Sequence, residues 1–324
     1  MKSWSKALVA AAIGVTALTT SAFAQSYPNR PVRIIVPFAA GGAMDVIVRV
    51  IAKKVSDDGG PQFVIENKTG AGGSIGVMAV KEAAPDGYTL AEVSSSTHVL
   101  NPHTTANIPY DPVKDFEPVV MLVRVPTLLA VPAGLPAKSF AELLEYGRKK
   151  PGGLTYGSAG VGSAPHITGA LFARSVGQSM THVPYRGLAG AMTDLVGGRL
   201  DFAFSSIPSL GGTVADGKIR VLAAAGPKRL GNHPNVPSMA ELGHPSVDVD
   251  LWFGIIAPLK TDAAIVRTLN QMFVKATNSP DLAPRLSELG VEIATGTPED
   301  FKKALVSDNA RLGPFLKELM AQSK

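Results

Sequence analysis

A loop of small residues joins two apolar segments near the start of the chain. The loop reads PFAAGG; β-branched residues precede it, and apolar residues at helical spacing follow Met44 and Asp45. Such a turn can offer unpaired N–H groups and the positive end of a helix dipole to an anion, and glycine permits the backbone angles that expose them. A tight turn without a ligand is the alternative, with Asp45 capping the helix or bonding back to the loop. The candidate anion-binding residues are Phe38, Ala39, Ala40, Gly41, Gly42, Met44 and Asp45.

A second glycine-rich loop, YGSAGVGSAPH, repeats this device farther along the chain. It also follows a predicted strand and precedes a predicted helix, the position at which α/β proteins bind ligands. Two such loops, one in each half of the chain, could hold one small anion from both sides. The candidates in this loop are Ser158, Ala159, Gly160, Gly162, Ser163 and His166.

Polar and aromatic residues near three other predicted strand ends could complete the pocket. Hydroxyls at the first of these ends could bind a ligand or merely cap a turn. Arg186 could pair with a second carboxylate through two parallel hydrogen bonds, although a surface position is the more frequent case for arginine. Phe204 could supply an apolar wall. The added candidates are Ser94, Ser95, Ser96, His98, Tyr185, Arg186, Phe204 and Ser205.

One segment raises the alternative of an enzyme. GGSIG, residues 72–76, matches the G-x-S-x-G pattern of a nucleophile elbow and makes Ser74 the candidate of a periplasmic serine hydrolase. An elbow needs its serine directly after a strand, whereas KTGAGG intervenes here. We therefore favour a binding protein without catalytic residues.

Other cofactor and metal patterns are missing from the sequence. The dinucleotide fingerprint fails because Pro165 stands where its third glycine belongs, and there is no Walker A sequence. His98 and His103 are separated by a proline and do not match a metal-binding helix. The chain has no cysteine, which excludes disulfides and thiolate metal sites. We expect neither a cofactor nor a metal.

The N-terminus has the pattern of a cleaved export signal, with Lys2 and Lys6, a short apolar run, and an A-x-A site that ends at Ala24. We expect a signal peptide over residues 1–24, a periplasmic location and, without cysteine, no lipid anchor. Removing the two lysines from the 31 basic residues leaves a charge of about +3 against 26 acidic ones. This scattered, mild charge argues against a nucleic-acid partner.

Strands and helices alternate in two successive sets. Predicted strands at 31–38, 61–68 and 89–95 alternate with helical segments, and strands at 154–160, 180–186, 199–208 and 219–226 follow the same plan. The helix over 139–150 opens with a capping box, Ser139 with Glu142. This alternation predicts an α/β protein whose lobes are mainly parallel sheets flanked by helices.

Two long extended segments, residues 120–132 and 247–258, could cross between lobes. The three C-terminal helical segments have no strands of their own to cover, so we expect them to return to the first sheet. This arrangement predicts a discontinuous first domain of residues 27–125 plus 250–324 and an inserted second domain of residues 126–249. It also requires two crossover strands.

Several motifs together resemble one known family. VIENKTGAGGSIG, APDGYTL, LTYGSAGVGSAPH, HVPYRG and LWFGIIAP, with the first loop, are similar to the Bug family, the substrate-binding proteins of tripartite tricarboxylate transporters. The similarity runs from about Tyr27 to the C-terminus. It implies a periplasmic two-lobed clamshell that captures a small organic carboxylate and hands it to a membrane permease. In relatives, the loops matching 38–45 and 158–163 clasp one carboxylate through backbone donors and ordered waters.

The sequence departs from the family pattern at Met44, where threonine is frequent. An apolar side chain there favours a ligand with a hydrophobic body, such as an aromatic or aliphatic diacid. Tricarboxylates, amino acids and nicotinate-like monocarboxylates are the alternative ligands. We expect a monomer. A ligand sensor for a signalling receptor would bind the same ligand but contact a different partner.

Overall fold

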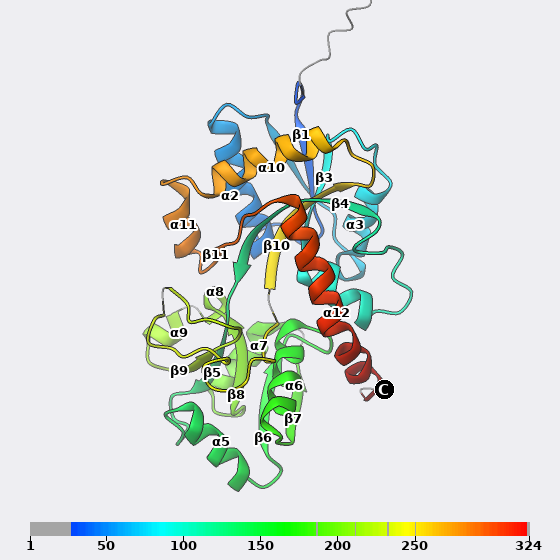
Figure 1. The fold of residues 1–324 in the computed structure, drawn as a ribbon. Helices are drawn as coiled ribbons and strands as arrows, with labels where there is room; N and C mark the ends of the chain where they lie inside the picture. The colour runs from blue at the N-terminus through cyan, green and yellow to red at the C-terminus, as the bar shows by residue number, and fades with distance from the viewer. Residues whose placement is uncertain (1–26, 186, 211, 232, 250, 323–324) are drawn as a thin grey trace, which may run out of the picture.

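The computed structural model describes residues 27–185, 187–210, 212–231, 233–249 and 251–322, and the predicted export signal lies outside them. Figure 1 shows two lobes, each built on one β-sheet with helices packed against it. The predicted two-lobed α/β fold is therefore confirmed.

The first sheet combines strands from both ends of the chain, in the order β11-β4-β10-β3-β1-β2. β1 pairs in parallel with β2 and β3, whereas β10 runs antiparallel to β3 and β4. Its strands are β1 (Val32–Val36), β2 (Phe63–Asn67), β3 (Thr89–Ser94), β4 (Phe116–Val125), β10 (Leu251–Pro258) and β11 (Glu292–Ile293). The helical elements of this lobe are α2 (Ala43–Asp57), η1 (Ala71–Gly73), α3 (Ser74–Lys81), η2 (Ser96–Leu100), α4 (Asn101–Thr104), α10 (Ala263–Thr277), α11 (Leu282–Glu288) and α12 (Pro298–Gln322).

The second sheet has the order β7-β6-β8-β5-β9. β6 pairs in parallel with β7 and β8, and β5 runs antiparallel to β8 and β9. Its strands are β5 (Thr127–Pro132), β6 (Leu154–Ser158), β7 (Met180–Pro184), β8 (Phe202–Ser206) and β9 (Ile219–Ala224). Its helices are α5 (Phe140–Lys149), α6 (Ala164–Val176), α7 (Leu188–Val196), α8 (Ile207–Leu210) and α9 (Gly212–Ala215).

Both sheets are mixed, which refines the prediction of mainly parallel sheets. The parallel pairs come from the strand–helix–strand units, as expected from the alternation. The antiparallel pairs involve β4, β5 and β10, the strands at the crossings between the lobes. Only Pro126 separates β4 from β5. β4 leads into the second lobe and β10 returns from it, so the two strands run in opposite directions beside each other.

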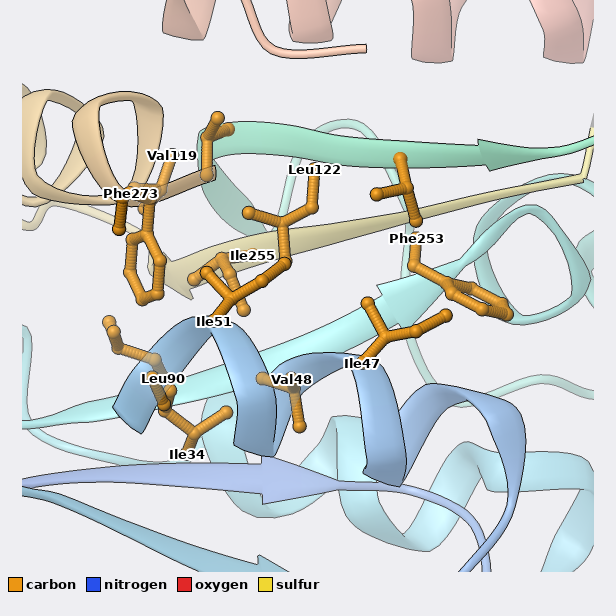
Figure 2. Close-up of a cluster of buried hydrophobic side chains, with 14 of the residues drawn as sticks. Ile34, Ile47, Val48, Ile51, Leu90, Val119, Leu122, Phe253, Ile255 and Phe273 are labelled. Carbon is orange, nitrogen blue, oxygen red and sulfur yellow. The ribbon is translucent and has the colours of Figure 1, made fainter. Parts of the chain in front are cut away.

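Helix α2 packs its apolar face against the first sheet (Figure 2). Ile47, Val48 and Ile51 are at most 2 % exposed and share one cluster with strand residues such as Ile34 and Ile255. Burial of each such side chain stabilises the fold by about 1.5–3 kcal/mol. This face fixes where the N-terminus of α2 lies.

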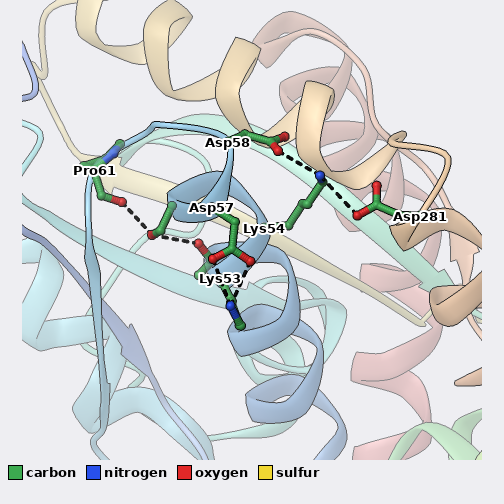
Figure 3. A network of polar contacts seen from close by, with 8 residues as sticks. Lys53, Lys54, Asp57, Asp58, Pro61 and Asp281 are labelled. Carbon is green, nitrogen blue, oxygen red and sulfur yellow. Dashed lines mark hydrogen bonds and ion pairs between the residues drawn. The ribbon is translucent and has the colours of Figure 1, made fainter.

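The C-terminal helices return to the first sheet, as predicted. Phe273 of α10 packs beside Val119 and Leu122 of β4 (Figure 2). A polar contact ties the far end of α2 to this region, because Lys54 Nζ lies 2.7 Å from Asp58 and 3.1 Å from Asp281 (Figure 3). Such partly exposed ion pairs contribute little to stability, so their role is orientation.

Helix α12 contacts both lobes. Figure 1 shows it running from the first lobe down beside α6. Leu312 and Leu316 share a buried cluster with Ile167 and Leu171 of α6, and Arg174 Nη1 lies 3.2 Å from Glu318 Oε2. The second lobe is therefore connected to the first by this helix as well as by the crossings. No helix among the described residues has the length and apolarity to cross a membrane.

One carboxyl group, that of Glu92, is buried without a hydrogen-bond partner among the described residues. Glu92 of β3 is 0 % exposed, and neither carboxyl oxygen has a hydrogen-bond partner among the described residues. Burial raises the pKa of Glu92 well above its usual range, and the charge of Asp45 raises it further. The folded state therefore holds a proton that the unfolded chain releases above about pH 4.5. Folding stability falls as pH rises above that value towards the folded-state pKa.

We predict that Glu92→Leu raises the free energy of unfolding at pH 8 by about 1–3 kcal/mol, because it removes an unpaired buried polar group. The variant also loses part of the decline in stability between pH 5 and pH 8. Urea denaturation at several pH values measures both effects. Glu288→Leu, at an exposed position of α11, is the control and changes stability by roughly 0.5 kcal/mol or less. Equal pH slopes for wild type and Glu92→Leu would contradict the assignment.

Candidate ligand-binding site

The first glycine loop leads directly from β1 into α2. Gly41 has a left-handed backbone with φ +80°, and Gly42 is the N-cap with φ −70° and ψ 165° and no side-chain cap. The residues from Ala39 to Ala43 are exposed. The first N–H groups of a helix have no partner within the helix. Those of α2 are therefore available to a ligand.

Asp45 turns back and holds this loop. Its carboxylate accepts hydrogen bonds from the N–H of Gly41, from Nε of Arg49 and from Nδ2 of Asn67, each at 2.9 Å. The bond from Arg49 contributes most to lowering the pKa of Asp45 to about 2. Asn67 Nδ2 also donates to the carbonyl of Phe38 at 3.0 Å. Asp45 is 3 % exposed, so it supports the loop from behind, and its ion pair with Arg49 offsets its negative charge.

Sequence reasoning missed Asn67 and Arg49, which complete this support. Asn67 is the last residue of β2 and pairs with Val36, the last residue of β1. Arg49 lies four residues after Asp45 on α2 and forms an i,i+4 ion pair with it. Strand register and helical spacing are the signals that point to these two residues.

The side chain of Met44 packs in the core. Its side chain is 7 % exposed and belongs to the cluster between α2 and the first sheet. The prediction that its side chain shapes the pocket is wrong, because Met44 lies three residues before Ile47 on the buried face of α2. Its position therefore gives no support for a hydrophobic ligand body.

The second loop is closed by its own side chains. Ser158 Oγ accepts from the N–H of Gly160 at 3.0 Å, and Ser163 Oγ donates to the Gly160 carbonyl at 2.6 Å. Gly160 and Gly162 have φ of +121° and +79°, and Ser163 is the N-cap of α6 with no side-chain cap. The serine hydroxyls shape the loop, and no side chain caps the first N–H groups of α6.

Two histidines stand behind the second loop. His166 Nδ1 accepts from the N–H of Gly162 at 3.1 Å, and His182 Nε2 lies 2.6 Å from Ser158 Oγ. The rings of the two histidines stack with centroids 4.0 Å apart. His166 was a predicted candidate, whereas sequence reasoning missed His182. Its place on β7 opposite Tyr156 of β6 follows only from strand pairing.

The two loops are linked through η2 and α4. A side chain at Gly73 would lie 3.2 Å from the Phe38 ring and 2.8 Å from Thr97. Asn101 Nδ2 donates to the Gly72 carbonyl at 2.7 Å. On the other side, a side chain at Gly162 would lie 3.6 Å from Thr104 of α4. The second loop therefore lies against α4, and Phe38, at the start of the first loop, lies beside Gly73 near η2.

The serine candidates are placed near this region. Ser94 and Ser95 are 2 % exposed, Ser205 is 0 % exposed, and their hydroxyls have no hydrogen-bond partner among the described residues. Ser96 begins η2 and is half-buried. Contact between these hydroxyls and a ligand stays a prediction.

His98 and Phe204 are interior side chains, and we correct both predictions of ligand contact. His98 is 0 % exposed, packs against Tyr110 and Phe116, and burial lowers its pKa to about 3. Phe204 is also 0 % exposed and packs against Phe172. The π-helical turn η2 directs His98 into the core.

Tyr185 adjoins the second loop through its backbone. Its N–H donates to the Ser158 carbonyl at 3.1 Å, and its hydroxyl donates to Asp194 Oδ2 at 2.6 Å. Burial contributes most to raising the pKa of Tyr185 to about 12. The predicted neighbour Arg186 lies outside the described residues.

The geometry around Ser74 does not form a nucleophile elbow. β2 ends at Asn67, η1 intervenes, and Ser74 is the first residue of α3. Its side chain is 6 % exposed, at the wall of a cavity of about 610 Å³ that Ile75, Met78 and Ile108 also line. An elbow holds its serine on a sharp turn directly after a strand. Within the described ranges, no group of three or more potential metal-ligating side chains occurs.

Comparisons with known proteins show the family of the chain. The family model described as tripartite tricarboxylate transporter family receptor matches residues 47–320. Protein BugT of Bordetella pertussis strain Tohama I is 31 % identical over 319 residues, which cover 98 % of each chain.

Two similar solved structures carry small carboxylates. Rpa4515 of R. palustris, solved with adipate, is 34 % identical with a TM-score of 0.78, and the match covers 91 % of this chain and 98 % of that one. MatC of Rhodopseudomonas palustris, solved with bound malate, is 30 % identical with a TM-score of 0.72, and the match covers 91 % of this chain and 100 % of that one.

The support of the first loop by Asp45 leads to a prediction. Asp45→Ala leaves the Gly41 N–H, Asn67 and Arg49 without their shared acceptor and lowers the free energy of unfolding at pH 7 by about 2–4 kcal/mol. Because the pKa of Asp45 is lowered to about 2, its contribution is complete above about pH 4 and is lost as pH falls towards 2. Urea denaturation at pH 7 and at pH 3 measures the difference.

Asp57→Ala provides the matched control for this test. Asp57 lies on the same helix but is exposed and pairs only with Lys53 among the interactions described for it. Its removal changes stability by about 0.5 kcal/mol or less. If Asp45→Ala were as mild as Asp57→Ala, the loop would not depend on the buried carboxylate.

Proposed function

Because the chain belongs to the tripartite tricarboxylate transporter receptor family, we propose that it captures a small organic dicarboxylate between its two lobes and delivers it to a membrane permease. The family assignment makes the chain a solute-binding receptor. The ligand class and the delivery step are the parts that we propose.

The observation that carries the proposal is the matched pair of helix N-termini. α2 and α6 both follow a glycine-rich loop, and their N-caps, Gly42 and Ser163, have extended backbones without a side-chain cap. Each helix start therefore offers first-turn N–H groups to an anion, with one fewer from α6 because Pro165 has no N–H. The only acidic residue in either first turn is Asp45, whose carboxylate is buried behind its loop. One carboxylate group held between the two helix starts would receive donors from both lobes.

An aliphatic dicarboxylate is the ligand class that the relatives favour. Adipate and malate, which the solved relatives carry, are both aliphatic dicarboxylates. In our proposal one carboxylate occupies the two loops, and the rest of the pocket selects the other end of the ligand. Because Met44 is buried, we extend no preference from its side chain.

The proposal includes export and closure. Residues 1–24 would direct export to the periplasm, and the lobes would comprise residues 27–125 with 250–324 and residues 126–249. Closure would be a rotation about the crossings at Pro126 and beside residue 250, favoured by a ligand that contacts both lobes. The single residue between β4 and β5 supports a short hinge there. No catalytic residue is required.

Removal of one donor tests the site without disturbing the fold. Ala43 is the first residue of α2, a position where proline fits, and the extended backbone of Gly42 is compatible with a following proline. Ala43→Pro deletes one N–H, so we expect carboxylate affinity to fall about tenfold or more, the worth of one charge-assisted hydrogen bond. Stability is unchanged or rises by up to about 1 kcal/mol.

The measurement is a thermal-shift and calorimetric screen of the mature protein. The panel contains adipate, malate, aromatic diacids, tricarboxylates, amino acids and the matching amides. Ala263→Pro, at the exposed start of α10 where Asp262 also has an extended backbone, is the control and keeps wild-type affinity. Equal affinities for acid and amide, or an unchanged carboxylate affinity in Ala43→Pro, would contradict the proposal.

The same screen addresses the enzyme alternative. Ser74→Ala keeps carboxylate affinity in our proposal, because Ser74 lies at the start of α3 and outside the two loops. Hydrolysis of a p-nitrophenyl ester by the wild type that disappears in Ser74→Ala would favour a hydrolase.

A further inference from the structure

We propose that His166 and His182 form a positioning pair that holds the second glycine loop in its binding conformation only while both imidazoles are neutral, so that ligand affinity weakens as pH falls. The inference rests on the proposed function for its effect on a carboxylate ligand. The pair itself is a property of the fold.

The backbone fixes the tautomer of His166. The N–H of Gly162 points at Nδ1 over 3.1 Å, and a backbone N–H can only donate. Nδ1 must therefore carry a lone pair, and the ring proton of neutral His166 lies on Nε2. The side chain is 3 % exposed, so water does not readily replace this acceptor.

The second histidine acts through Ser158. Ser158 Oγ accepts from the N–H of Gly160 at 3.0 Å, and its single hydrogen has two nearby acceptors, the Gly160 carbonyl at 3.1 Å and His182 Nε2 at 2.6 Å. The Gly160 carbonyl already accepts from Ser163 at 2.6 Å. In our proposal the serine hydrogen goes to the shorter contact, with a lone pair on His182 Nε2. Both histidines then accept from the same loop.

Neighbouring groups favour the neutral forms. Burial lowers the pKa of both histidines, and for His182 the adjacent His166 adds to the effect and lowers its pKa to about 4. The ring centroids are only 4.0 Å apart, so a second positive charge is opposed by the first. A cavity lies beside the two imidazole rings, and the other titratable groups that line it are Tyr156, Arg174 and Glu318. Arg174 forms an ion pair with Glu318.

Protonation of His166 would break its hydrogen bond with the N–H of Gly162. A proton on Nδ1 of His166 would face the N–H of Gly162, two donors with no acceptor between them, and the loop would have to open. The lowered pKa values mean that the folded state binds fewer protons than the unfolded chain, whose histidines titrate near pH 6.5. The stabilisation is complete above about pH 6.5 and is lost as pH falls through the folded-state values.

The first experiment needs no ligand. NMR titration of the full mature protein follows the imidazole carbons of His166 and His182 and the amides of Gly160 and Gly162. We expect both imidazoles to titrate well below pH 6.5 and the Gly162 amide to shift with the same midpoint as His166. Midpoints near 6.5, or a Gly162 amide that ignores the titration of His166, would overturn the proposal. This result stands even if no carboxylate binds and the proposed function fails.

The second experiment measures binding. The dissociation constant of adipate is determined from about pH 3.5 to pH 8 for wild type, His166→Phe, which lacks the acceptor, and His166→Asn, whose Oδ1 replaces Nδ1. We expect His166→Phe to bind about tenfold more weakly at pH 7.5, the loss of roughly one hydrogen bond. His166→Asn restores most of this affinity and flattens the pH profile. His233→Asn, in the loop that follows β9, is the control and keeps the wild-type profile.

The variants separate positioning from folding. Thermal denaturation of each variant shows whether it is folded at the temperature of the binding assay. If His166→Phe is folded and binds as wild type, or if His166→Asn keeps the wild-type pH profile, the pair does not position the loop. Failure of the wild type to bind adipate and every other acid of the panel would reject the proposed function, and the NMR titration alone then decides the histidine pair.

Discussion

The placement of α2 on the first sheet is the constraint on which the candidate site depends. Its buried face, with Ile47, Val48 and Ile51 against the strands, determines where the helix begins. Asp45 then ties the preceding loop to the helix and to β2 through Asn67. Apolar packing therefore sets the position of the helix start, and one buried carboxylate sets the shape of the loop. Backbone donors held in this way lose little freedom when an anion binds.

The second loop reaches a similar result with different chemistry. Among the described residues no buried carboxylate supports it; serine hydroxyls close it, and two imidazoles stand behind it. Because α6 packs against α12, whose first half belongs to the first lobe, the helix start beneath this loop is also connected to the first lobe. The two helix starts that we propose as the anion site thus pack on separate sheets, and the crossings and one long helix connect them.

Much of this arrangement could be predicted from local sequence. The two glycine loops, the helices after them and the return of the C-terminal helices all follow from periodicity and from the order of the elements. The N-cap predicted at α5 is also present, with the Glu142 N–H donating to Ser139 Oγ at 3.2 Å, although the Glu142 carboxylate accepts from the N–H of Lys138 and not from that of Ser139. These features depend on residues close together in the chain, or on apolar faces that must be covered.

Met44 could have been placed from the sequence, whereas residues whose role depends on tertiary contacts could not. Met44 precedes Ile47 and Ile51 by three and seven residues, so helical spacing already indicates the buried face on which the structure places it. His98 could not be placed, because a π-helical turn has no simple sequence pattern. Asn67 and His182 act across strand pairs, and register is not visible in a single segment.

The central claim is that backbone N–H groups of both loops bind one carboxylate. The most direct test is a ¹⁵N amide chemical-shift map of the perdeuterated mature protein with and without adipate. The account predicts that the largest shifts fall on two separate groups of amides, residues 39–44 and 159–164, and that the matching diamide produces neither. Shifts confined to one loop, or centred on the cavity beside α3, would contradict it.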